Sequence, residues 1–113
     1  MAEWIGFDFD GTLCRFSDQL PAPGMVERVK YFRDAGIEVR ILTARIASKY
    51  PTEHREAHAK IIQDWCLKHI GEVLPVTSEK DYDMALLYDD RAIAVETDTG
   101  RLRGFHDMIG LTT

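Results

Sequence analysis

The chain has 113 residues, of which 45% are hydrophobic and 29% are charged, and its formal net charge at pH 7 is −5. This length and composition predict one folded domain over residues 1–113 and exclude a disordered chain. The acidic balance disfavours nucleic acid as a partner, and the lack of an apolar run of about 20 residues or of a signal-peptide pattern predicts a cytoplasmic location without a membrane span.

The first half of the chain predicts a strand, a loop, a helix and a second strand. A short apolar run that ends in acidic residues predicts a buried strand over residues 4–9. Glycine and prolines make residues 11–23 typical of a loop. From Gly24 onward, apolar residues recur at helical spacing, and Gly36 is a suitable end for that helix. Residues 37–42 are again apolar and predict the second strand.

The second half continues the alternation. Pro51 ends the loop after the second strand, and Thr52 is a suitable N-cap for a helix that Gly71 ends. Three further short apolar runs predict strands over residues 73–76, 84–88 and 92–95. Thr99 and Gly100 then indicate a turn, after which residues 101–105 return as a hairpin strand.

This alternation of strands and helices predicts right-handed βαβ units. The expected fold is therefore a single α/β domain with a mostly parallel, five-stranded sheet. Ligands of such sheets bind beyond the carboxyl ends of the strands. The residues that follow the first, second and fourth strands are thus the candidate functional site.

Acidic, hydroxyl and basic side chains fall at this predicted edge. They are Asp8 and Asp10 after the first strand, Thr43 after the second, Lys80 before the fourth, and Asp89 and Asp90 at its end. A carboxylate that attacks a phosphate is repelled by it, so phosphoryl transfer needs a cation. Carboxylate oxygens favour Mg²⁺, and a lysine adds a fixed positive charge. Each group alone is also compatible with a solvated turn or surface charge, but together they predict phosphoryl transfer.

The string Phe7–Leu13 (Phe-Asp-Phe-Asp-Gly-Thr-Leu) resembles the first signature of the haloacid dehalogenase-like (HAD) hydrolase superfamily. The Ile-Leu-Thr string at 41–43 is similar to the second signature, Lys80 to the third, and the Leu-Tyr-Asp-Asp string at 87–90 to the fourth. The resemblance spans residues 4–95. It implies a Rossmann-like sheet of order 3-2-1-4-5 with helices on its faces.

The resemblance also implies a role for each site residue. Asp8 would be the nucleophile, forming an aspartyl-phosphate, and Asp10 the general acid and base. The phosphate would be held by Thr43 and Lys80. The Mg²⁺ ligands would be Asp8, the backbone carbonyl of Asp10, Asp89, and Asp90 directly or through water. An acid at position 10 implies a phosphatase rather than a dehalogenase, a phosphonatase or a transport ATPase.

Two departures from the superfamily pattern bear on the site. Residues 11–23 and 46–71 are too short for a cap domain, so we expect an open site, unless a homo-oligomer neighbour or the 13–22 loop covers it. Few residues separate the third and fourth strands, although a parallel crossover usually needs about a dozen or more. The helix expected before Lys80 is therefore missing. The alternative lysines are Lys49 and Lys68.

The expected substrate is a small phosphomonoester. The acidic pair at 89–90 and the Pro-Gly-Met string at 23–25 are similar to small nucleotidase-like members, which favours a nucleoside monophosphate. An open site also permits a polynucleotide 3′-phosphatase, although the net charge of −5 disfavours it. The non-enzymatic alternative is a module that binds Mg²⁺ or phosphate without turnover.

Other polar residues have less specific patterns. His54 and His58 lie four apart on a predicted helix, which suits either a zinc site or a solvated face. Arg45 and Arg91 each follow a site motif and could contact substrate or form surface ion pairs. The two cysteines are expected to be free thiols in a reducing compartment, with a reactive role for Cys14 as the alternative.

Overall fold

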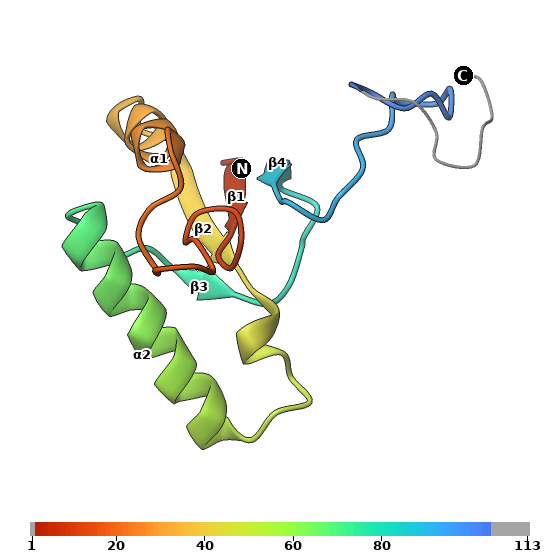
Figure 1. Ribbon diagram of the computed structural model, residues 1–113. Coiled ribbons are helices and arrows are strands. Elements are labelled where there is room, and N and C mark those ends of the chain that lie inside the picture. Colours follow the sequence, from red (N-terminus) through yellow and green to blue (C-terminus); the bar gives the residue numbers. More distant parts are fainter. Residues whose placement is uncertain (1, 105–113) are drawn as a thin grey trace.

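Strands and helices alternate along residues 2–104, which are the part of the chain that this computed structural model describes (Figure 1). The elements are β1 (Trp4–Asp8), α1 (Met25–Asp34), β2 (Glu38–Leu42), the short 3₁₀ helix η1 (Ala44–Ile46), α2 (Thr52–His69), β3 (Val76–Thr77) and β4 (Met84–Tyr88). The sequence patterns predict these elements in this order, except η1. Thr52 is the first residue of α2 rather than its N-cap, and Pro51 takes the cap position without a side-chain hydrogen bond.

The strands form one parallel sheet of order β3-β2-β1-β4. The predicted α/β fold with a parallel sheet is therefore confirmed. Asp8, the last residue of β1, pairs with Leu42 at the end of β2, and Phe7 pairs with Tyr88 at the end of β4. This register brings the carboxyl ends of three strands to the same level at one edge of the sheet.

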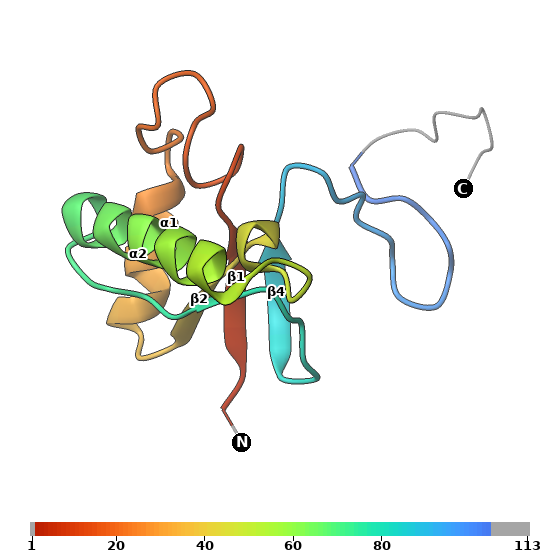
Figure 2. The same ribbon diagram turned by 90° about the horizontal axis from the view of Figure 1, so that it is seen from below.

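The prediction of a fifth strand in this sheet is wrong. Residues 92–95 are exposed and pair with no strand of the sheet. Only residues 89–91 separate them from β4, and a parallel crossover usually needs about a dozen or more residues. The segment instead extends away from the sheet on the β4 side (Figure 2).

Residues 92–104 fold back on themselves after leaving the sheet. Val95 and Leu102 form an isolated antiparallel bridge, and the turn between them contains Asp98 and Gly100, both with positive φ. In place of the predicted hairpin strand over residues 101–105, the described residues of this segment form this single bridge. Phe105, the last residue of the predicted hairpin strand, lies outside the described residues.

The third strand is shorter than predicted and starts later. Pro75 has no N–H to donate to a neighbouring strand, which explains why pairing in β3 begins at Val76. Leu74 is buried in the core, whereas Val73 is half exposed. Residues 73–75 are therefore not part of the sheet, and Leu74 among them packs in the core.

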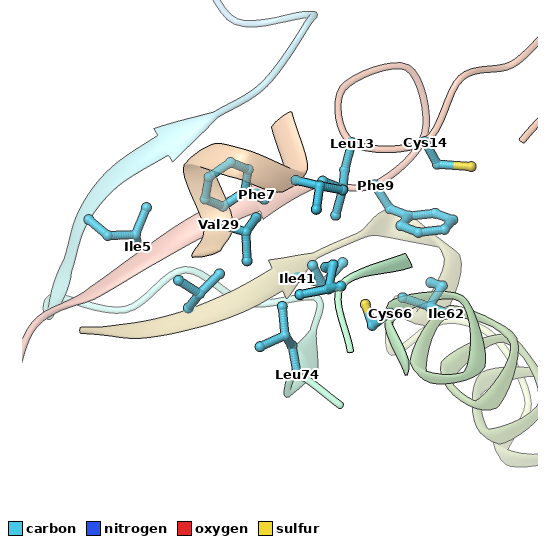
Figure 3. Close-up of a cluster of buried hydrophobic side chains, with 13 residues drawn as sticks. Ile5, Phe7, Phe9, Leu13, Cys14, Val29, Ile41, Ile62, Cys66 and Leu74 are labelled. Carbon is cyan, nitrogen blue, oxygen red and sulfur yellow. The ribbon is translucent and has the colours of Figure 1, made fainter. Parts of the chain in front are cut away.

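The hydrophobic core lies between one face of the sheet and the two helices (Figure 3). Phe7 of β1 and Ile41 of β2 belong to this face of the sheet and are fully buried. Val29 contributes the α1 side of this core, and Ile62 and Cys66 contribute the α2 side. The apolar face of each helix therefore packs on the same face of the sheet.

Helices on both faces of the sheet were expected, and this expectation is wrong within residues 2–104. The connections from β1 to β2 and from β2 to β3 step across the sheet in the same direction, and right-handed crossovers then place α1 and α2 on one side (Figure 1). The return from β3 to β4 is too short for a helix. It crosses the other side of the sheet as extended chain.

This return connection, residues 78–83, is anchored on the helix-free face. The indole Nε1 of Trp4 donates a 2.7 Å hydrogen bond to Asp81 Oδ1, and Arg40 Nη1 donates to Asp81 Oδ2 at 3.3 Å. The Arg40 guanidinium lies 4.5 Å from the Trp4 ring centroid. A Cβ at Gly6 would lie 3.2 Å from that ring, so the glycine makes room for the buried tryptophan.

No helix within residues 2–104 combines the length and the apolar character needed to cross a membrane.

Candidate active site

A cavity of about 440 Å³ lies at the carboxyl ends of the strands. Each strand or its following loop contributes polar side chains to the lining. These are Asp8 and Asp10 after β1, Thr43 and Arg45 after β2, Ser78 and Lys80 after β3, and Asp89 and Arg91 after β4. Five of the six residues predicted for the site thus line one cavity, because parallel strands end at a common edge.

The sixth predicted residue, Asp90, lies beside this cavity in a carboxylate cluster. One ligand oxygen each from Asp8, Asp89 and Asp90 lies within 4.8 Å of the others. Burial and the neighbouring Asp89 and Asp90 carboxylates together raise the pKa of Asp8 to about 7, against a hydrogen bond from Thr12 that lowers it. The cluster therefore concentrates negative charge that the surrounding side chains do not neutralise.

Thr12 links the loop after β1 to the loop after β4. Its buried hydroxyl accepts a 2.8 Å hydrogen bond from the Asp90 N–H and lies 3.1 Å from Asp90 Oδ1 and 3.4 Å from Asp8 Oδ2. Thr12 is a candidate functional residue that was not predicted from the sequence. Its place in the Asp-Gly-Thr string was the available signal, because a hydroxyl there can hold two loops of a site together.

Gly11 is required by the close approach of these same loops. Its φ of +84° is strained for a residue with a side chain. A Cβ at this position would also lie 2.5 Å from Asp90 Oδ2 and 2.6 Å from the Phe16 ring. Both the conformation and the space therefore disfavour a larger residue beside the carboxylate cluster.

The Asp10 side chain does not belong to the carboxylate cluster. Its two oxygens accept hydrogen bonds from Arg45, Oδ1 from Nη2 at 2.6 Å and Oδ2 from Nε at 2.8 Å. Such a bidentate pair fixes the plane of both groups. Of the two roles considered for Arg45, ion pairing is the one present in this structure. The hydrogen bonding of the Arg45 guanidinium to the Asp10 carboxylate raises the pKa of Arg45.

Thr43 joins this ion pair to the end of β2. Its buried hydroxyl accepts a 3.2 Å hydrogen bond from the Arg45 N–H and caps η1. The Thr43 N–H in turn donates to the Thr77 carbonyl of β3 at 2.9 Å. Because the hydroxyl oxygen accepts from the backbone, its hydrogen is available to a group in the cavity.

Lys80 lies in the extended connection between β3 and β4, exposed and within the cavity lining. It forms no ion pair with another residue of the described part of the chain. The alternative lysines are elsewhere. Neither Lys49 nor Lys68 lines the cavity, and the Lys49 ammonium lies over the Tyr50 ring at 5.2 Å.

The loop after β1 borders the cavity but forms no domain over it. Within it, the Arg15 N–H donates to the Leu20 carbonyl at 2.9 Å, which folds the segment into a short flap. Trp65 of α2 anchors this flap through a 2.7 Å hydrogen bond to the Gln19 carbonyl. Phe16 lines the cavity while 67% of its surface remains exposed. Residues 11–23 are therefore a flap, and residues 46–71 contain the last residue of η1, a loop and α2.

His54 and His58 stack on α2 with ring centroids 4.2 Å apart. Within residues 2–104, the one group of three or more potential ligands that are close enough to share a metal ion is the aspartate cluster. The histidine pair therefore has no third ligand in this part of the chain. Cys14 and Cys66 are both free and buried, and burial raises the pKa of each thiol, to about 12 for Cys66.

Comparisons with known proteins identify the fold but no family. The chain matches no known protein-family description and no curated protein. A conserved protein from Bacteroides thetaiotaomicron of known structure is similar, with a TM-score of 0.54 and 18% sequence identity over 81% of this chain and 78% of that one. At this level of identity the likeness establishes a shared α/β fold and carries no statement about activity.

Proposed function

We propose that this chain is a Mg²⁺-dependent phosphomonoesterase of the HAD type, a single Rossmann-like domain whose nucleophile is Asp8. The observation that carries the proposal is the pairing of two features at one strand edge. A cluster of three carboxylates lies beside a cavity lined by Thr43 and Lys80, a hydroxyl donor and a cation. This combination suits a phosphate group bound next to a divalent metal ion.

The donor set fits Mg²⁺. Asp8, Asp89 and Asp90 offer only hard carboxylate oxygens. Burial and then the repulsion from Asp89 and Asp90 raise the pKa of Asp8, and a bound cation would offset both effects. When bound by these three residues, Mg²⁺ would offset the negative charges of the nucleophile and the phosphate. The Asp10 carboxylate is directed to Arg45, so any contribution from Asp10 to the metal would come from its backbone carbonyl.

The chain's own residues divide the remaining work. Thr43 and Lys80 would hold the phosphate oxygens while an Asp8 oxygen attacks phosphorus in line with the leaving oxygen. Asp10 would donate a proton to the leaving oxygen as the P–O bond breaks. It would then accept a proton from the water that attacks the aspartyl-phosphate, which frees Asp8 and phosphate.

The test is hydrolysis of p-nitrophenyl phosphate with and without Mg²⁺. Asp8→Asn keeps the shape of the side chain but removes the nucleophile. Asp34→Asn, an exposed substitution on α1, is the matched control. Mg²⁺-dependent turnover by the wild type and by Asp34→Asn, with none by Asp8→Asn, would support the proposal. Equal rates for the wild type and Asp8→Asn would contradict it.

The substrate we propose is a small phosphomonoester, with a nucleoside monophosphate as the first candidate. No cap domain covers the cavity within residues 2–104, so the 3′-phosphorylated end of an oligonucleotide could also enter. A panel of nucleotides, sugar phosphates and a 3′-phosphorylated oligonucleotide separates these substrates. Phosphate binding without turnover on any of them would instead favour the non-catalytic binding module.

A further inference from the structure

The Arg45–Asp10 ion pair has a feature that the proposed function does not use. Both partners belong to the lining of the cavity, and both are about two-thirds buried. Each oxygen of Asp10 accepts from a different nitrogen of Arg45, so the carboxylate is turned toward η1. The proposed acid and base is therefore engaged by another residue of the site.

The position of Arg45 is fixed from three sides. Thr43 caps η1 and accepts from the Arg45 N–H, so the residue is tied to the proposed phosphate site. Arg55 of α2 donates a 3.1 Å hydrogen bond to the Ile46 carbonyl, which ties the other end of η1 to the helix. The guanidinium carbon lies 5.4 Å from the Phe9 ring centroid. The backbone that carries Arg45 is thus held at the site, and its guanidinium contacts Asp10 and the Phe9 ring.

We propose that Arg45 is a positioning residue that exchanges partners. It holds the Asp10 carboxylate before substrate binds, and it turns to an oxygen of the phosphate when substrate binds beside Thr43, which releases Asp10 toward the leaving oxygen. A phosphate dianion can compete with the Asp10 carboxylate for the guanidinium, because either anion matches the forked geometry and the positive charge of an arginine. Only hydrogen bonds change in this exchange, and no covalent bond is made or broken. The effect of this exchange on turnover rests on the proposed function, whereas its effect on phosphate binding does not.

The first test measures binding of inorganic phosphate by calorimetry in the presence of Mg²⁺, which requires no turnover. Loss of the guanidinium in Arg45→Met should weaken phosphate binding about tenfold, the usual effect of losing a charge-assisted hydrogen bond. Arg45→Lys should recover part of this affinity. Arg33→Met is the matched control, because Arg33 forms a comparable 2.8 Å ion pair with Glu72 away from the cavity.

Because Asp10 and phosphate compete for Arg45 in this proposal, removing the charge of Asp10 should have the opposite effect on phosphate binding. Asp10→Asn frees Arg45 and should tighten phosphate binding about fivefold, whereas in the Arg45→Met background the same substitution should change the affinity less than about twofold. If Asp10 only orients Arg45 for phosphate, Asp10→Asn would weaken binding. That result would overturn the exchange, as would unchanged phosphate affinity in Arg45→Met or a wild type that binds no phosphate.

The second test compares two substrates. p-Nitrophenolate leaves without a proton, whereas the alkoxide from an alkyl phosphate needs one. Arg45→Met should therefore lose more kcat on the alkyl phosphate than on p-nitrophenyl phosphate, and Arg45→Lys should lose less on both. Equal losses on the two substrates would assign Arg45 a structural role only. Absent turnover in the wild type would refute the proposed function, and the binding measurements would still decide the exchange.

Discussion

Replacing Asp8 by asparagine should stabilise the metal-free protein at alkaline pH, although it removes the proposed nucleophile. Burial and the carboxylates of Asp89 and Asp90 raise the pKa of Asp8 from 3.8 to about 7. Between these two values the folded state keeps a proton that the unfolded state has lost. The contribution of Asp8 to stability therefore falls as the pH rises from about 4 to about 7, and the full cost is present above pH 7.

The size of this effect follows from the change in pKa. A rise from 3.8 to about 7 corresponds to about 4 kcal/mol if the group were fully shielded from water. Because the side chain is only half-buried, solvent screening reduces the expected cost to about 1–2 kcal/mol. For a domain of this size, such a gain raises the melting temperature Tm by about 4–10 °C.

Thermal unfolding followed by circular dichroism at pH 5 and pH 8, in EDTA, tests this reasoning. Asp8→Asn should melt above the wild type at pH 8, and the difference should shrink at pH 5. Adding Mg²⁺ should raise the Tm of the wild type more than that of the variant, because the metal relieves a repulsion that asparagine lacks. The exposed Asp34→Asn should behave as the wild type. A variant that melts at or below the wild type at pH 8 in EDTA would refute the argument.

Three further substitutions or modifications test other parts of the structure. Gly11→Ala should lower the free energy of unfolding by about 1–3 kcal/mol in urea titrations, because its Cβ would approach Asp90 Oδ2 and the backbone would stay strained; an unchanged value would contradict the geometry. Cys66, whose pKa is raised to about 12 by burial, should not react with a thiol reagent at pH 8 until the protein unfolds, whereas rapid native labelling would place it at the surface. Asp81→Ala should lower Tm and shift the fluorescence maximum of Trp4 to longer wavelength as the indole loses its acceptor and its cover, and an unshifted spectrum would argue against this anchor.

The strand edge was predictable because it depends on short, local signals. Apolar runs that end in acidic or hydroxyl residues mark where β1, β2 and β4 stop, and parallel pairing then brings those ends together. This is why Asp8, Thr43 and Asp89 line one cavity, as expected from the sequence. The two neighbours that complete the cluster geometry, Gly11 and Thr12, act through contacts with the loop after β4, which lies far away in the sequence.

The direction of Asp10 could not be derived in the same way. An acid two residues after Asp8 could share its face or turn away from it, and the sequence left both open. The outcome depends on Arg45, whose place is set by η1. A three-residue 3₁₀ helix has no periodicity to detect, so neither the element nor the pairing of Arg45 with Asp10 could be anticipated.

The prediction of a fifth strand was wrong because of the length of the connection and not because of the composition of the segment. Residues 92–95 are apolar enough for a buried strand, and local pattern alone favours one. Joining β4 in parallel requires a long crossover, and residues 89–91 cannot provide it. The segment pairs instead with its own return through Val95 and Leu102. Connection length was therefore a better guide here than hydrophobicity.

The connection between β3 and β4 is also short, but it still joins two strands of the sheet, and it carries Lys80. Residues 78–83 are too few for a helix, yet an extended chain covers about 3.3 Å per residue and can cross β2 and β1. The residue next to Lys80, Asp81, is held by the indole of Trp4 and the guanidinium of Arg40. These two bonds fix the extended connection one residue away from the lysine. This anchored extended connection can thus place a cation at the cavity beside the ends of the strands, as a helix before the lysine would otherwise do.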